Sequence, residues 1–108
     1  MTKDFAGRGK VAILRTAPDT VLEDYARLMD LAGVREALPQ DKETILKINI
    51  SWQTWYPACS TAPWQLEGVI RGLRAAGYED LIAGHNDTVV VDAHVGERNN
   101  KHKFVVDT

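Results

Sequence analysis

One lysine stands inside an apolar run, and it is the first residue of this sequence whose surroundings suggest chemistry. Lys47 interrupts the run Ile45–Ile50 and precedes Asn49 by two residues. Burying an unpaired ammonium group is costly, so three interpretations are open. Lys47 binds an anion or acts in catalysis beside Asn49, it extends its long side chain to solvent from the strand end, or it forms a structural salt bridge.

Further polar side chains follow the apolar runs that we expect to be strands. They lie in the three loops 16–19, 51–63 and 85–88. The carboxyl ends of parallel strands share one sheet edge, where ligands bind in open α/β folds, and a helix N-terminus there favours negative charge. We therefore predict a site for an anionic small molecule, either a carboxylate or a phosphate. Its ligand-binding residues would be Lys47, Asn49, Ser60, Thr61, His85, Asn86 and Asp87.

Two other kinds of site would use the same loops. His85 and Asp87 are of the types that ligate metals, with Asp92 or His94 as a third ligand, and they would suit a metal-dependent hydrolase or oxygenase. Cys59 could act as a nucleophile with His85 as its base. Such short spacings are common by chance, and no sequence signature supports the nucleophile. We therefore expect neither a metal nor a cofactor in this chain and leave the catalytic residues unassigned.

Aromatic side chains are concentrated in the longest of these loops. All three tryptophans, Trp52, Trp55 and Trp64, lie within thirteen positions, together with Tyr56. Residues 48–70 contain no lysine or arginine, whereas proteins that bind single strands place a basic groove beside their aromatic residues. The rings therefore favour an apolar ligand or a protein interface, or they fold back over the sheet as local core.

These aromatic residues suggest a second function of a different class. The chain would be a non-catalytic interaction or oligomerisation module, with Trp52, Trp55 and Tyr56 in its interface. The C-terminal strand of the chain, exposed at the edge of the sheet, would form the rest of that interface, because an unpaired edge is a template for pairing.

Composition narrows the possible partners. The 108 residues carry 13 Lys plus Arg against 15 Asp plus Glu, a net charge of −2, and duplex binding normally needs a basic excess. A single cysteine excludes an intrachain disulfide and a four-cysteine cluster. The sequence has neither a signal-like apolar start nor an apolar run of bilayer length. We therefore expect a cytoplasmic protein that binds a small anion, a second copy or a larger subunit, and that binds neither nucleic acid nor membrane.

The elements that must position these residues follow from apolar spacing. Runs at Val11–Leu14, Ile45–Ile50 and Leu81–Gly84 predict buried strands, and helical patterns over 21–32 and 64–76 separate them. Strands that alternate with helices predict an α/β fold with a mainly parallel sheet. The core would have the order β-α-β-α-β, with helices packed on the sheet through right-handed crossovers.

Turn residues and the tail complete the predicted domain. Gly33 and Gly77 are placed to end the two helices, and residues 34–38 would add one turn. In the tail, Val89–Val91 and Phe104–Val106 predict one or two short strands.

The whole chain, 1–108, is expected to form a single small α/β domain with a loose N-terminal lead-in over 1–9. The predicted polar turn 96–103 would join the two tail strands. The sequence stops two residues after an apolar run, which a truncated or split parent protein, or a partner that completes the sheet, would explain.

An ordered series of segments in the middle of the chain resembles a known family. The series is Leu46–Ile50, then Ser60–Pro63, then a helix that ends at Ala75–Gly77, then Leu81–Gly84. It resembles domain of unknown function 362, in which a strand ends in a Lys-Pro-Asn-like motif, a Thr/Pro helix start follows, and a Gly-Ala-rich helix end leads to another strand. The resemblance covers about residues 10–87, which would be the N-terminal part of the family domain.

This resemblance implies an α/β domain in a redox setting, because members often occur beside ferredoxin-type iron–sulfur domains. It assigns site roles to Lys47, Asn49, Thr61 and Asp87. Ile48 departs from the family because proline usually stands there, and the Trp-rich loop is not a family feature. The chain has no cysteine-rich segment, so no iron–sulfur cluster is expected in it.

Overall fold

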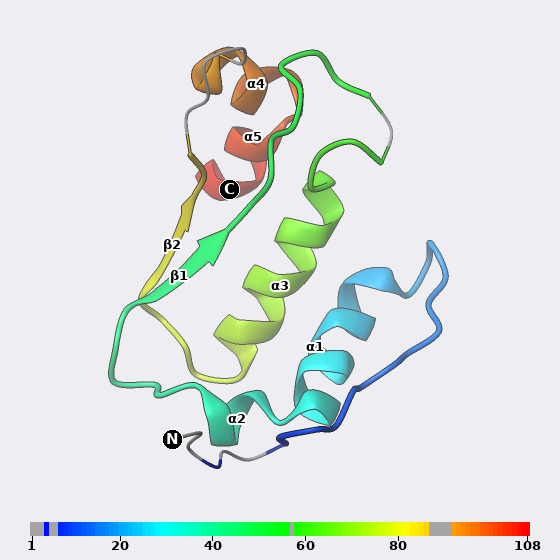
Figure 1. Cartoon of the computed structure of the whole chain (residues 1–108), viewed down its shortest axis with the longest axis vertical. Helices are drawn as coiled ribbons and strands as arrows, with labels where there is room; N and C mark the ends of the chain where they lie inside the picture. The colour runs from blue at the N-terminus through cyan, green and yellow to red at the C-terminus, as the bar shows by residue number, and fades with distance from the viewer. Residues whose placement is uncertain (1–3, 5–6, 57, 87–91) are drawn as a thin grey trace.

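The computed structural model describes residues 4, 7–56, 58–86 and 92–108, and it places a short sheet beside a pair of helices (Figure 1). Helices and strands both occur, which confirms the α/β prediction in its coarse form. The elements in chain order are α1 (Val21–Ala32), α2 (Val34–Ala37), β1 (Thr44–Lys47), α3 (Pro63–Ala75), β2 (Leu81–Gly84), α4 (Ala93–Asn99) and α5 (His102–Asp107).

The sheet of the described residues has two strands, and they are parallel as predicted. β1 pairs with β2 in a register that places Ile45 beside Ile82. β1 ends at Lys47, three residues before the predicted end of the strand. Just beyond β1 the Ile48 N–H still donates to the Gly84 carbonyl at 2.9 Å, while the Asn49 N–H, which faces away from β2, donates to the Thr61 hydroxyl at 3.0 Å.

The predicted first strand, Val11–Leu14, does not form. These residues pair with no strand in the described part of the chain, and the side chains of Val11 and Ile13 are 84% and 81% exposed. Figure 1 shows this segment passing α1 on the side away from the sheet. Because a strand needs a neighbour for its backbone hydrogen bonds, the full β-α-β-α-β core is not confirmed.

Two glycines bring α1 and α3 together. A Cβ atom added to Gly68 would lie 2.5 Å from the Tyr25 ring, and one added to Gly72 would lie 2.4 Å from the Met29 methyl group. The Tyr25 ring would have to shift to admit a Cβ at Gly68, whereas at Gly72 the Met29 methyl group could move aside and the Ala26 Cα, at 3.1 Å, would be the tighter limit. The two glycines are four residues apart and therefore lie on one face of α3.

The buried core lies where α3 ends and β2 begins. It contains Leu73, Ala76 and Tyr78, packed against half-buried side chains from α1, α2 and both strands. The Tyr78 hydroxyl donates to the Leu38 carbonyl at 2.8 Å, which ties the segment after α2 to the core. Gly33 ends α1 with φ 82°, so the predicted left-handed helix end is confirmed.

The predicted strand Phe104–Val106 is wrong, because these residues lie in α5. His102 is buried and Val105 is half-buried three residues later. That spacing puts both on one face of a helix, whereas a strand would place them on opposite faces. The other predicted tail strand, Val89–Val91, lies outside the described residues.

The predicted turn 96–103 instead contains the end of α4 and the start of α5. Asp92 caps the start of α4, and its carboxylate accepts a hydrogen bond from the Val95 N–H at 3.0 Å. This is a standard side-chain cap of a helix start. In the described part of the chain, no helix is both long enough and apolar enough to cross a membrane.

Candidate functional site

Lys47 lies at the exposed end of β1. Its ammonium group donates to the Ile48 carbonyl at 2.7 Å and to the Asn49 side-chain oxygen at 3.0 Å. No carboxylate forms an ion pair with Lys47 among the described residues. The side chain therefore reaches solvent and is held by oxygens of the two residues that follow it.

Three other predicted site residues, Asn49, Ser60 and Thr61, come together and bond across the base of the long loop. The Thr61 N–H donates to the Asn49 carbonyl at 2.9 Å, while the Asn49 N–H donates to the Thr61 hydroxyl at 3.0 Å. The Ser51 N–H donates to the Ser60 hydroxyl at 3.1 Å. These bonds form a closed neck, and we call residues 52–59 above it the aromatic loop.

The remaining predicted anion ligands follow β2. His85 is half-buried, Asn86 is exposed, and Asp87 lies outside the described residues. The anion site stays a prediction, and Lys47→Met tests it. Phosphate or carboxylate binding to the folded protein should be lost in that variant if Lys47 is the anion's main partner, whereas retained affinity contradicts the prediction.

The metal site and the nucleophilic cysteine, which were the two alternative kinds of chemistry, also stay without structural support. No group of three His, Cys, Asp or Glu side chains in the described part of the chain could hold a metal ion. Cys59 is exposed, and no hydrogen bond of the described residues joins it to His85.

α4 and α5 hold the aromatic loop and its neck from one side. The Asn100 side-chain amide donates to the Trp52 carbonyl at 3.1 Å and to the Gly96 carbonyl at 2.9 Å. His102 bonds through Nε2 to the Thr61 carbonyl. Asn100 and His102 are only 2% and 1% exposed, so these contacts are shielded from water and hold the loop firmly.

A second pair of contacts, closer to solvent, involves Gln53. The Asn99 side-chain amide donates to the Gln53 carbonyl at 3.0 Å, and the Asp92 N–H donates to the Gln53 side-chain oxygen at 3.0 Å. The first two residues of the aromatic loop are thus fixed to both ends of α4. Sequence reasoning missed Asn99, Asn100 and His102 because they fell in a predicted turn.

The rings of the aromatic loop point into solvent. Trp52, Trp55 and Tyr56 are 48%, 57% and 68% exposed, so they do not form local core. The loop turns back where the Cys59 N–H donates to the Tyr56 carbonyl at 3.2 Å, and Ala58 adopts φ 60°. Three large rings are thus exposed within five positions of the chain, next to a base that is held by α4.

Trp64 belongs to a different environment at the start of α3. Its ring is tilted by 49° against Tyr25 of α1, with ring centroids 6.4 Å apart. It also lines an apolar cavity of about 490 Å³ beside the predicted loop 16–19. The cavity is lined by Thr16, Ala17, Pro18, Val21, Leu22, Trp64 and Glu67.

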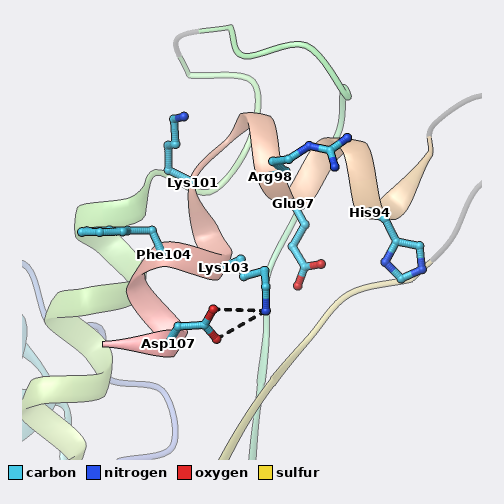
Figure 2. Close-up of a pocket in the computed structure, with 7 residues that line it drawn as sticks. All are labelled: His94, Glu97, Arg98, Lys101, Lys103, Phe104 and Asp107. Atoms are coloured by element: carbon cyan, nitrogen blue, oxygen red, sulfur yellow. Dashed lines mark hydrogen bonds and ion pairs between the residues drawn. The ribbon is translucent and has the colours of Figure 1, made fainter.

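A broad hollow over α4 and α5 gathers charged side chains (Figure 2). Lys103 forms an ion pair with Asp107 at 3.1 Å, while Arg98 and Lys101 extend in other directions. Cations and carboxylates are both present, so the hollow has no strong preference for one sign of ligand charge. Its lining is His94, Glu97, Arg98, Lys101, Lys103, Phe104 and Asp107.

Asp24 is buried near the start of α1 and receives three hydrogen bonds. The Thr20 hydroxyl donates at 2.7 Å, the Thr16 hydroxyl at 2.8 Å and the Arg27 guanidinium at 2.7 Å. These donors, Thr20 first, lower the pKa of the Asp24 carboxyl, against the opposing effect of burial. The carboxylate fixes the loop before α1, which is a structural role.

Comparison with known proteins does not add to this picture. No family model, no curated protein and no solved structure matches the chain. The resemblance to domain of unknown function 362 therefore stays a prediction from the sequence, and the candidate site stands on its own geometry.

Proposed function

We propose that this protein is an interaction module that binds a partner protein through its aromatic loop. The observation that carries the proposal is the loop itself, whose rings Trp52, Trp55 and Tyr56 face solvent above a hydrogen-bonded neck. Tryptophan and tyrosine are the residue types most enriched among the side chains that dominate binding energy at protein interfaces.

The fixed base of the loop favours tight binding. Binding is weakened when flexible side chains and loops must become ordered in the complex. Here the backbone of Trp52 is bonded to Asn100 and that of Gln53 to Asn99 before any partner arrives. The base of the loop therefore loses little conformational freedom on binding.

The chemistry of the loop selects the partner class. Residues 48–70 contain no lysine or arginine, so neither a nucleic acid nor an anionic membrane surface is favoured. The partner surface that fits is an apolar pocket or groove on another protein, with polar groups at its rim.

Site-specific photo-crosslinking tests this function in cells that make the protein. A benzophenone-bearing phenylalanine replaces Trp55, and in a matched control it replaces Leu31, an exposed apolar residue on α1. We expect adducts with a discrete protein from position 55 and none of that protein from position 31. Absence of any discrete adduct, or the same adducts from both positions, contradicts the proposal.

A binding measurement with the partner so identified makes the test quantitative. Trp55→Ala should weaken binding by about 30-fold or more, as expected for a central tryptophan at an interface. Leu31→Ala should leave the affinity unchanged. Both variants should keep the thermal stability of the parent protein, because both side chains are exposed.

A further inference from the structure

The extended segment Lys10–Arg15 has the features of a strand without a neighbour. It carries the two most exposed of the large hydrophobic side chains, Val11 and Ile13. The backbone groups of residues 11–15 enter no hydrogen bond among the described residues. Unpaired apolar strands readily pair with another chain. We therefore call residues 10–15 the donor strand, meaning a strand that could add to the edge of another sheet.

The outer edge of β1, on the side away from β2, is the sheet edge to which such a strand could add. Thr44 and Ile48 point their N–H groups toward β2 and donate to the Asp80 and Gly84 carbonyls at 2.8 and 2.9 Å. Backbone groups alternate sides along a strand. Every second residue of β1 therefore directs its N–H and C=O groups away from β2, toward the outer edge. Ile45 on this strand is 69% exposed.

The segment of the same chain does not occupy this edge. In Figure 1 the sheet lies on one side of α3 and the segment lies on the far side of α1. The two helices pack closely through Gly68 and Gly72, and this packing holds the donor away from its own sheet.

We infer that the Lys10–Arg15 segment of a second copy of this chain adds to the outer edge of β1, and that the exchange is reciprocal. The product is a two-fold dimer with two intermolecular strand pairs. This surface is separate from the aromatic loop, so the inference goes beyond the proposed function and does not depend on it.

Charge complementarity favours one register for the pairing between this segment and β1, and it favours a second copy of this chain as the partner at that edge. The segment begins with Lys10, whereas exposed acidic residues precede both strands, Glu43 before β1 and Asp80 before β2. A parallel register with Lys10 beside Glu43 also places Ile13 beside Leu46, on the half-buried face of β1. Opposite charges and apolar pairs at neighbouring positions on adjacent strands both stabilise a sheet.

Sedimentation of the purified full chain tests the dimer. We expect the parent protein to be dimeric, and Ile13→Lys to weaken dimerisation about 100-fold or more, because the two-fold dimer loses two buried isoleucines, one in each strand pair. Phe104→Lys, a change at an exposed apolar residue on α5, should leave the dimer intact. A parent protein that stays monomeric at high concentration overturns the inference. A dimer that resists Ile13→Lys but dissociates with Trp55→Ala also overturns it and assigns self-association to the aromatic loop.

Disulfide trapping tests the register separately. In a Cys59→Ser background, one protein carries Ala12→Cys and the other carries Ile45→Cys, two positions that the register places side by side. Adjacent strands lie close enough for a disulfide, so mixing should give a cross-linked pair under mild oxidation. The control mixture pairs Ala12→Cys with Phe104→Cys, on α5, and should not cross-link. A dimer that gives no Ala12–Ile45 link, or links equally in the control, contradicts the β1 edge as the acceptor.

Discussion

Replacing Asn100 by alanine should loosen the aromatic loop, and neighbouring Asn99 provides the control. Asn100 is buried and its amide donates to the Trp52 and Gly96 carbonyls, whereas Asn99 is exposed and donates only to the Gln53 carbonyl. Gly96 keeps a partner in the variant, because its carbonyl also accepts the Asn100 N–H at 2.9 Å. The Trp52 carbonyl loses its bond from the residue that caps the end of α4.

The magnitudes follow from these bonds. Losing the two hydrogen bonds of the Asn100 amide, at about 0.5–1.5 kcal/mol each, reduces the free energy of unfolding by about 1–3 kcal/mol. For a domain of this size, that loss lowers the melting temperature by about 4 °C per kcal/mol. Asn99→Ala removes one exposed bond and should cost less than about 0.5 kcal/mol.

Urea unfolding and amide hydrogen exchange together measure the effect. In Asn100→Ala the N–H groups of Ser51 and Thr61, which close the neck, should exchange about 5- to 150-fold faster, the factor that 1–3 kcal/mol implies for local opening. In Asn99→Ala they should keep the exchange rates of the parent protein. Equal stability losses in the two variants, or unchanged exchange at Thr61 in Asn100→Ala, would refute the assignment of Asn100 as the residue that holds the loop.

Two further predictions concern the helix pair. Because the pKa of Asp24 is lowered in the folded protein, its contribution to stability is complete above the unfolded value of about 3.9 and is lost as the pH falls through the lower folded value. Asp24→Asn should therefore flatten the acid side of a stability profile measured by urea unfolding, and an unchanged profile would show that Asp24 is not responsible. Gly68→Ala should cost about 1 kcal/mol net, because overpacking against Tyr25 costs about 1–3 kcal/mol and helix propensity returns about 1 kcal/mol. Gly84→Ala, whose added Cβ meets open space, should leave thermal stability unchanged, and an equal loss in both variants contradicts the packing argument.

The parts of the fold that depend on local spacing were predictable from the sequence. The apolar residues of α1 recur at helical intervals and Gly33 ends the helix, so the predicted range 21–32 agrees with the structure. The start and end of β2 also agree with the prediction. Such signals are contained in a few consecutive residues.

The parts that depend on distant contacts were not predictable. Val11–Leu14 has the composition of a strand, but whether it pairs is decided by residues far along the chain. Phe104–Val106 suits a strand or a helix equally, and its conformation is fixed by the bond from His102 to Thr61, which lies 41 residues away. A three-residue apolar run carries too little periodicity to separate the two structures.

The candidate site was predictable in one respect and missed in another. Clustering of Trp52, Trp55 and Tyr56 along the sequence favours an interface, and the exposure of these three rings agrees with that interpretation. The residues that hold the loop, Asn100 and His102, gave no such signal, because polar residues in a tail look the same whether they are buried or free. The capping position of Asp92 before α4 was the one local sign of a helix there.

Fluorescence of a single tryptophan tests the central claim, that the aromatic loop is a preformed and exposed binding surface. Trp52 and Trp64 are replaced by phenylalanine, so that Trp55 is the only tryptophan, and the protein is studied at a concentration where it is monomeric. The account predicts emission typical of a solvent-exposed indole, efficient quenching by acrylamide, and anisotropy close to that of the whole molecule. Blue-shifted emission protected from acrylamide would show that the ring is packed against its own chain, and it would contradict the proposed function.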